Sequence, residues 1–230
     1  GGAEARPFIT NLHALNLKMY LSISPELYLK RLIVGDFERV FTICKNFRNE
    51  GIDRTHNPEF TMMELYASYM DYNDMMDITE KLLNEIAKKI NGKIEIDYQG
   101  KKISLKIPFK RMTMFESIKK FAKVSPKKLS PEEIDKIFEE KVQPNLIQPT
   151  FIVDYPIELC PLTKEHRKNK KLVERFELFI NGLEIANAYS ELNDPIEQKR
   201  RLVEQIQIKK RKDAKDFDAH LEANVIDEDF

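Results

Sequence analysis

Two strand-like runs joined by a polar loop constrain this fold more than any other part of the sequence. Residues 40–44 (Val-Phe-Thr-Ile-Cys) are β-branched and aromatic, and a second run covers residues 60–66. Runs of this composition around a short polar segment predict an antiparallel hairpin. Because strand side chains alternate between faces, one face of the second strand carries Phe60, Met62, Glu64 and Tyr66. We expect polar and aromatic groups to gather on that face and an aliphatic layer to pack beneath it, formed by Thr61, Met63 and Leu65.

The polar residues of this hairpin have two interpretations. If the first strand stays regular, Arg48 and Glu50 share a face and could form a surface ion pair, which is a common structural feature. Glu64 favours a binding site instead, because a carboxylate among methionine and leucine side chains is seldom buried without a partner. An arginine, a loop with a histidine, an aromatic ring and a carboxylate suit a nucleotide phosphate, a stacked base and a cationic small molecule.

Composition narrows the class of protein. The 230 residues suffice for one domain with a substantial core and an insertion. The 38 basic and 38 acidic side chains cancel, so any contact with RNA must be local. No apolar run reaches the length of a membrane span, and no signal-peptide pattern opens the sequence. Cys44 and Cys160 lack metal-type spacing, which favours reduced thiols in a cytoplasmic protein.

Helices are predicted on both sides of this hairpin. Ser24 and Pro25 are typical of a helix start, and Gly35 is typical of its end. A second helix is predicted over residues 74–91. It should bury an apolar stripe that recurs every four residues: Ile78, Leu82, Ile86 and Ile90.

Turn residues predict two further hairpins. Gln99-Gly100 separates the alternating runs 93–98 and 102–107. Asn181-Gly182 is a strong two-residue turn signal within residues 172–190.

The middle of the chain changes character. Residues 108–147 are rich in Lys and Glu, and residues 130–133 form a capping box that opens a helix. We expect a small helical insertion here, within a single domain covering residues 1–230, before a strand over residues 148–155. The runs 164–171 and 199–212 are basic with acidic neighbours, so they are solvated surface or, as the alternative, an RNA contact.

Several segments together resemble a known family. Phe47-Arg48-Asn49-Glu50, the loop after it and residues 56–60 resemble motif 2 of the class II aminoacyl-tRNA synthetases. More narrowly, the chain resembles the bacterial-type lysyl-tRNA synthetases at segments that follow the family's order: residues 1–8, 25–32, 48–66, 148–151 and 187–194. This resemblance implies an α+β fold in which helices flank an antiparallel sheet, as in the class II catalytic core.

The resemblance also implies an activity. Lysine would attack the α-phosphate of ATP to give lysyl-adenylate and pyrophosphate, and the lysyl group would then pass to tRNA(Lys). ATP, Mg²⁺, lysine and tRNA(Lys) are the implied ligands, and the full-length protein would be a homodimer. Two alternatives stay open. One is a non-catalytic paralogue that binds lysine or RNA, and the other is a ligase that attaches lysine to an elongation factor.

For ATP, the resemblance assigns most roles to the first hairpin. Arg48 would be the catalytic arginine that holds the α-phosphate and the amino-acid carboxylate, since a planar guanidinium can bind either anion through two donors. Glu50 would bind the adenine amino group, and His56 and Asn57 would meet the triphosphate. Phe60 would stack on adenine, although apart from the motif it would be interpreted as ordinary core.

Two further carboxylates are candidate magnesium ligands. A two-residue turn at 181–182 pairs Phe179 with Glu184 and places Glu177 on the same face, where hard oxygen ligands could hold Mg²⁺ and the ATP phosphates. The alternative is two exposed strand carboxylates. A regular strand would point Glu184 and Asn187 to opposite faces, although the family uses both in one site. We therefore predict a bulge near Ala186.

The lysine site implied by the resemblance is acidic. A desolvated ε-ammonium group needs carboxylate partners, and removing one partner of a buried charge pair costs on the order of 2–5 kcal/mol. The implied lysine-binding residues are Gly2, Glu26, Arg48, Glu64, Tyr66, Asn187, Tyr189 and Glu191. Tyr189 stands where the family usually has phenylalanine, and Gly2 would let the backbone approach the substrate closely.

The family's motif 1, motif 3 and anticodon-binding domain have no counterpart in this sequence. The resemblance therefore implies an internal piece of a longer synthetase. The isolated chain is expected to show weak adenylate chemistry at best, because motif 3 carries the arginine that holds the β- and γ-phosphates of ATP.

Overall fold

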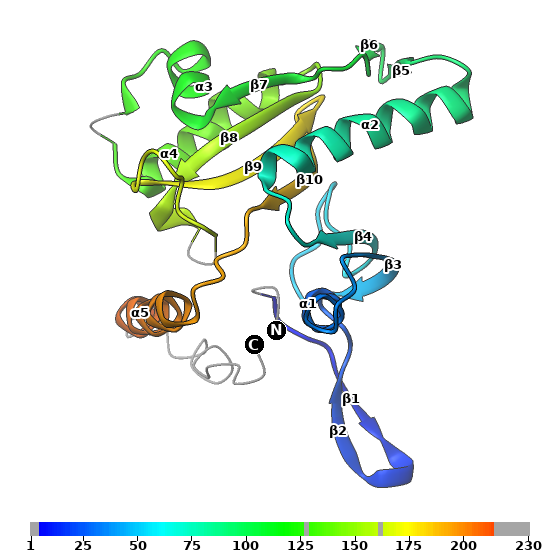
Figure 1. Cartoon of the computed structure of the whole chain (residues 1–230), viewed down its shortest axis with the longest axis vertical. Helices are drawn as coiled ribbons and strands as arrows, with labels where there is room; N and C mark the ends of the chain where they lie inside the picture. Colours follow the sequence, from blue (N-terminus) through cyan, green and yellow to red (C-terminus); the bar gives the residue numbers. More distant parts are fainter. Residues whose placement is uncertain (1–4, 127–128, 161–162, 214–230) are drawn as a thin grey trace. The chain divides into compact units, whose positions relative to one another are not determined.

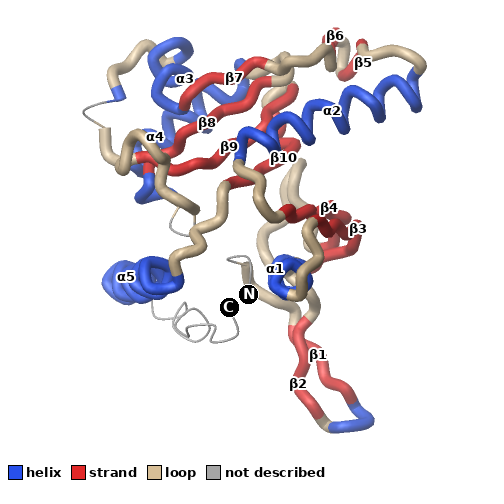
Figure 2. Tube along the Cα trace, in the orientation of Figure 1, coloured by secondary structure: helices blue, strands red, loops and turns tan. Residues whose placement is uncertain are grey.

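The computed structural model describes residues 5–126, 129–160 and 163–213, which divide into two compact units (Figures 1 and 2). The first unit runs to Tyr69 and the second starts at Met70. Both contain helices and antiparallel strands, which confirms the predicted α+β class. None of the helices within the described ranges has the length and apolarity needed to cross a bilayer.

The first unit consists of two hairpins and a helix. Its elements are β1 (Ile9–Leu12), the 3-10 turn η1 (His13–Leu15), β2 (Leu17–Tyr20), α1 (Glu26–Val34), β3 (Arg39–Phe47) and β4 (Glu59–Ala67). The α1 helix follows Ser24-Pro25 and ends before Gly35, as predicted. The β3–β4 ladder is regular from Arg39 opposite Ala67 to Phe47 opposite Glu59, which confirms the first hairpin.

The packing of this hairpin differs from the prediction. The polar and aromatic face with Glu64 is the half-covered one, since Ser24, just before α1, donates a hydrogen bond to Glu64. The aliphatic face is open: Phe41 is 70 % exposed and Ile43 is 64 % exposed. No described element of the first unit covers that face. The alternation of side chains identified the two faces of the hairpin, but it could not show which face packs against another element.

The second unit is built on a sheet in the order β10-β9-β8-β7. Its strands are β7 (Lys110–Thr113), β8 (Thr150–Pro156), β9 (Leu172–Ile180) and β10 (Leu183–Tyr189). The β7–β8 pair is parallel and the others are antiparallel. Alternation along the strands divides the core into two layers, one on each face of the sheet.

One layer packs Phe151, Phe176 and Leu178 against helix α2 (Tyr72–Asn91) (Figure 1). The other packs Ile152 and Phe179 against a group of helices. These helices are α3 (Met114–Phe121), α4 (Pro131–Ile137) and the π-helical turn η3 (Phe138–Val142). The predicted stretch 108–147 thus contains helices from Met114 onward, but it begins with a strand of the main sheet, and its helices pack into one of the two core layers.

Remaining elements of the second unit are shorter or lie at its end. They are β5 (Glu95–Tyr98), β6 (Lys101–Ser104), the 3-10 turns η4 (Gln143–Asn145) and η5 (Ile157–Leu159), and α5 (Pro195–Asp213). Both hairpin turns are confirmed, because Gln99-Gly100 and Asn181-Gly182 all have positive φ, as such two-residue turns require.

The buried stripe of α2 is not the predicted one. Ile90 is 76 % exposed and Ile86 is also exposed, while Glu80 and Asn84 are buried. Glu80 accepts a hydrogen bond from Phe109 N (2.8 Å), and Asn84 Nδ2 donates one to Leu105 O (2.7 Å). These two polar side chains satisfy the backbone of the segment that leads to β7. The prediction from hydropathy therefore chose the wrong side of the helix.

Candidate active site

The predicted site residues fall into both units. The first unit carries Glu26, Arg48, Glu50, His56, Asn57, Phe60, Glu64 and Tyr66. The second carries Glu177, Glu184, Asn187, Tyr189 and Glu191. Gly2 lies outside the described residues.

Acidic side chains of the first unit form a connected cluster around Ser24. The buried Ser24 hydroxyl accepts a hydrogen bond from Glu26 N (3.1 Å) and donates one to Glu64 Oε1 (3.0 Å). Tyr66 OH donates to the other carboxylate oxygen of Glu64 (3.0 Å). Glu26 is itself buried and pairs with Lys30 Nζ (2.6 Å). The structure thus brings Glu26, Glu64 and Tyr66 together, as predicted.

This cluster is suited to a cationic ligand. The hydroxyl groups of Ser24 and Tyr66 occupy only part of the acceptor positions of the Glu64 carboxylate. The Glu26–Lys30 pair is neutral, so the cluster keeps the negative charge of Glu64. Sequence reasoning missed Ser24, which it interpreted only as a helix cap, and Lys30, although its i,i+4 spacing from Glu26 on α1 was a readable signal.

Arg48 is oriented by the hairpin on which it lies. Its backbone N donates to Pro58 O (2.8 Å), its Nε donates to Ile23 O (3.4 Å), and its guanidinium lies 5.1 Å from the centre of the Phe60 ring. Such a cation–π contact holds the guanidinium plane at the aromatic face. Arg48 and Phe60 are therefore adjacent, as a site for phosphate and a stacked base would need.

The alternative interpretation, a surface ion pair between Arg48 and Glu50, is not seen. Both residues lie beyond the end of β3 at Phe47, so strand alternation does not apply to them. Glu50 N donates to Arg48 O (3.0 Å) in a tight turn, and no ion pair joins the two side chains in the part of the chain that the structure describes. The surface ion-pair interpretation is therefore not supported.

The loop between the strands is organised by Asp53. Its carboxylate accepts hydrogen bonds from Thr55 N (2.7 Å) and His56 N (2.9 Å), and it contacts His56 Nδ1 (2.7 Å). The hydrogen bond from the Thr55 backbone, followed by that from the His56 side chain, holds the pKa of Asp53 well below its usual range. His56 and Asn57 are exposed on this loop. Asp53 was missed because an Asp in a loop carries no distinctive pattern.

The predicted bulge is present in β10. Glu184 pairs with Phe179, but Ala186 pairs with Leu178 and Asn187 with Glu177, so the register shifts at Ile185. The shift returns Asn187 to the face that carries Glu177 and Glu184. The three side chains that the resemblance places in one site therefore share a face of the sheet.

The two candidate metal ligands differ in their surroundings. Glu177 accepts a hydrogen bond from Tyr155 OH (2.8 Å) and one from Arg175, whose guanidinium lies 5.0 Å from the Tyr155 ring centre. Burial raises the pKa of Glu177, the nearby Arg175 charge lowers it, and the Glu184 charge raises it further. Glu184 is exposed. The interpretation as exposed strand carboxylates thus holds for Glu184 and not for Glu177.

The donor set fits a hard cation only in part. Carboxylate and amide oxygens on one face are the ligands that Mg²⁺ prefers. Within the described ranges, however, no group of three or more His, Cys, Asp or Glu side chains could hold a metal. A cation between Glu177 and Glu184 would need phosphate or water oxygens to complete its shell.

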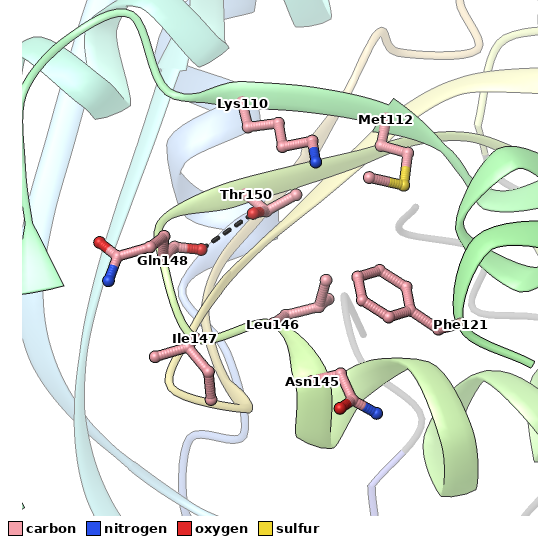
Figure 3. Close-up of a pocket in the computed structure, with 8 residues that line it drawn as sticks. All are labelled: Lys110, Met112, Phe121, Asn145, Leu146, Ile147, Gln148 and Thr150. Atoms are coloured by element: carbon pink, nitrogen blue, oxygen red, sulfur yellow. Dashed lines mark hydrogen bonds between the residues drawn. The ribbon is translucent and has the colours of Figure 1, made fainter. Parts of the chain in front are cut away.

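A cavity of the second unit lies elsewhere (Figure 3). Its volume is about 300 Å³, and its walls combine apolar side chains with the Lys110 amine: Lys110, Met112, Phe121, Asn145, Leu146, Ile147, Gln148 and Thr150. Not one of these residues belongs to the predicted site. We therefore do not assign this cavity to the substrate.

Similarity to known proteins covers the whole chain. The sequence profile of the tRNA synthetases class II (D, K and N) matches residues 1–226. The lysine--tRNA ligases of Carboxydothermus hydrogenoformans and Porphyromonas gingivalis are each 49 % identical over all of this chain, which covers 50 % and 42 % of them. Lysine--tRNA ligase 2 of Methanosarcina mazei is 48 % identical, again over all of this chain and 48 % of the relative. The chain spans about half the length of these curated relatives.

Proposed function

Because the chain belongs to the class II tRNA synthetases of the D, K and N type, we propose that the protein carrying it is a lysine–tRNA ligase. The observation that supports lysine as the amino acid is the cluster of Glu26, Ser24, Glu64 and Tyr66. Aspartate or asparagine would need cationic or amide partners at these positions. The relatives named lysine--tRNA ligase support the same choice.

In the proposed first step, the lysine carboxylate attacks the α-phosphorus of ATP and pyrophosphate leaves. Arg48 would hold the α-phosphate and the attacking carboxylate, with its guanidinium kept in place by Phe60 and Ile23 O. Such a step depends on positioning and charge neutralisation more than on a protein nucleophile. Glu50 would bind the adenine amino group, Phe60 would stack on adenine, and the exposed pair His56 and Asn57 would meet the triphosphate.

The lysine side chain would extend toward the acidic cluster. Glu26, Glu64 and Tyr66 would receive an ammonium group. Asn187, Tyr189 and Glu191 of the second unit, and the backbone at Gly2, are further proposed lysine contacts. Glu177 and Glu184 would hold Mg²⁺, which when bound would neutralise phosphate charge.

In the proposed second step, a hydroxyl of the terminal ribose of tRNA(Lys) attacks the lysyl carbonyl and AMP leaves. We further propose that the protein acts as a homodimer in the cytoplasm, where ATP and tRNA are available.

Amino-acid-dependent exchange of pyrophosphate into ATP tests this proposal. The native polypeptide that contains this sequence should exchange label with lysine and not with aspartate or asparagine. Exchange driven by aspartate or asparagine would contradict it. Lysine binding without any exchange would favour the non-catalytic binding paralogue, and charging of a protein instead of tRNA would favour the elongation-factor ligase.

A further inference from the structure

An ion pair between a buried carboxylate and a partly exposed arginine, outside the predicted site, links separate segments of the second unit. Glu174 on β9 is 1 % exposed, and Arg167 grips its carboxylate through Nε (2.6 Å to Oε1) and Nη2 (3.0 Å to Oε2). Arg167 Nη2 also donates to Asp71 Oδ2 (2.7 Å), and Asp71 caps the start of α2. The arginine of the basic run 164–171 is thus committed to an internal contact rather than to RNA.

Ser190 closes this network into a ring. Its backbone N donates to Glu174 O (2.9 Å), and its Oγ accepts a hydrogen bond from Tyr72 N (3.1 Å). Burial alone would raise the pKa of Glu174, but its contacts with Arg167 and Ser190 outweigh it and lower the pKa. The ring Asp71–Tyr72–Ser190–Glu174–Arg167 therefore fixes one residue at the end of β10.

The ring is connected to the proposed lysine site through Ser190. Ser190 lies between Tyr189 and Glu191, both proposed to bind lysine. Tyr189 pairs with Arg175, and the hydrogen bond from Ser190 N to Glu174 O continues the ladder by one residue. Alternation then places Ser190 on the α2 side of the sheet and Tyr189 on the opposite face, which carries Asn187 and Glu177. Glu191 follows Ser190 directly and forms a bridge with Thr163. Holding Ser190 in register therefore holds Tyr189 on the site face and fixes the start of the segment that carries Glu191.

Stability alone is a poor explanation for this arrangement. Removing the Glu174 carboxylate from water costs much of what its attraction to Arg167 returns, so an apolar residue of similar size often stabilises a fold as well. What a charged ring provides in addition is a fixed geometry, because each of its hydrogen bonds has a preferred direction. A fixed strand end matters most where side chains must meet a ligand.

We propose that Glu174 is a positioning residue for lysine, which acts through Arg167 and Ser190 to hold Tyr189 on the site face and to fix the start of the segment that carries Glu191. This inference rests on the proposed function.

The test compares Arg167→Gln and Glu174→Gln with the unchanged native polypeptide in lysine-dependent pyrophosphate exchange. Arg167 is largely exposed, so its variant should fold even if the Glu174 variant does not. We expect KM for lysine to rise about tenfold, as for a small displacement of binding groups, while KM for ATP stays within about twofold. Arg167→Lys should restore part of the loss. Glu80→Gln is the matched control, because Glu80 is also a buried carboxylate and its partners, Phe109 N and Arg111, lie elsewhere.

A second readout separates this inference from the proposed function. Amide hydrogen exchange at residues 187–191 should be faster in both ring variants than in Glu80→Gln. Unchanged exchange there, or an equal rise of both KM values, would overturn the inference even if the wild-type enzyme is a lysine–tRNA ligase. Absence of lysine-dependent exchange in the wild type would overturn the proposed function, and hydrogen exchange would still decide whether Glu174 holds the strand end.

Discussion

At the scale of single residues, the charge of Glu64 is the feature on which amino-acid choice depends. Glu64→Gln keeps the shape and one acceptor oxygen for Ser24 or Tyr66, but it replaces the other oxygen by an amide donor and removes the negative charge. Loss of one partner of a desolvated ion pair costs on the order of 2 kcal/mol or more, so lysine should bind at least about 30-fold more weakly. Calorimetric titration of lysine measures this. Glu59→Gln on the same strand, which removes an exposed pair with Lys45, should leave the affinity unchanged.

A second residue, Asp154, should make the stability of the fold depend on pH, because its carboxyl group is partly buried. Asp154 has a φ of 60° and accepts a hydrogen bond from Tyr72 OH (3.1 Å). Burial raises its pKa, although the Tyr72 hydrogen bond works in the other direction. A carboxyl whose folded pKa lies above its unfolded value destabilises the fold once pH exceeds both values.

Asp154→Asn should therefore raise the midpoint of thermal unfolding at pH 7. Asparagine tolerates the same backbone conformation and can still accept from Tyr72. The gain should be below about 1 kcal/mol, as for most single substitutions outside the core, and it should shrink as pH approaches 3.8. Thermal unfolding at pH 7 and pH 4 checks this. A gain that is the same at both values would show that the charge of Asp154 is not its cause.

At the scale of elements, the bulge in β10 permits a test by deletion. Ile185 is the extra residue between Glu184 opposite Phe179 and Ala186 opposite Leu178. Deleting Ile185 should leave both pairings and both faces intact, so the protein should stay folded with a loss of less than about 2 kcal/mol. Deleting Ala188 should instead send Tyr189 to the opposite face, since a one-residue slip reverses every side chain beyond it. Circular dichroism melts compare the two. Unfolding caused by the Ile185 deletion would mean that the bulge itself is required.

Local signals predicted the elements better than their packing. The turns at Gln99-Gly100 and Asn181-Gly182 were predictable because two-residue hairpins demand positive φ at those positions. The buried side of α2 was not, because Glu80 and Asn84 are buried by backbone partners that lie far away in the sequence. Propensity and hydropathy describe a helix by itself and contain no information on such partners.

The candidate site was likewise predictable from sequence motifs only in part. The family motif placed Arg48 near Phe60 and Glu64 near Tyr66, and the conflict between Glu184 and Asn187 predicted the bulge. The supporting side chains were missed, Ser24 and Asp53 among them, because serine and aspartate in short loops have many uses and their partners are set by tertiary contacts.

At the scale of the whole molecule, apolar burial is uneven. Both clusters of buried apolar residues lie in the second unit, whereas Leu29 is the buried apolar residue of the described part of the first. A chain of about 60–70 residues is marginal even with a good core. Residues 70–213 expressed alone should therefore unfold cooperatively, and residues 5–69 alone should not. Calorimetry of both fragments checks this, and a cooperative transition in the shorter fragment would contradict it.

The open aliphatic face of β3 has a consequence for synthesis of the protein in the cell. Phe41 and Ile43 leave the ribosome before the second unit, which spans residues 70–224. At roughly 5–20 residues per second, translation of that unit takes about 8–30 s. Phe41 and Ile43 are exposed both during this interval and in the finished protein, so an apolar, β-branched strand face of the kind that chaperones bind is open throughout. The yield of folded protein should then depend on chaperone supply.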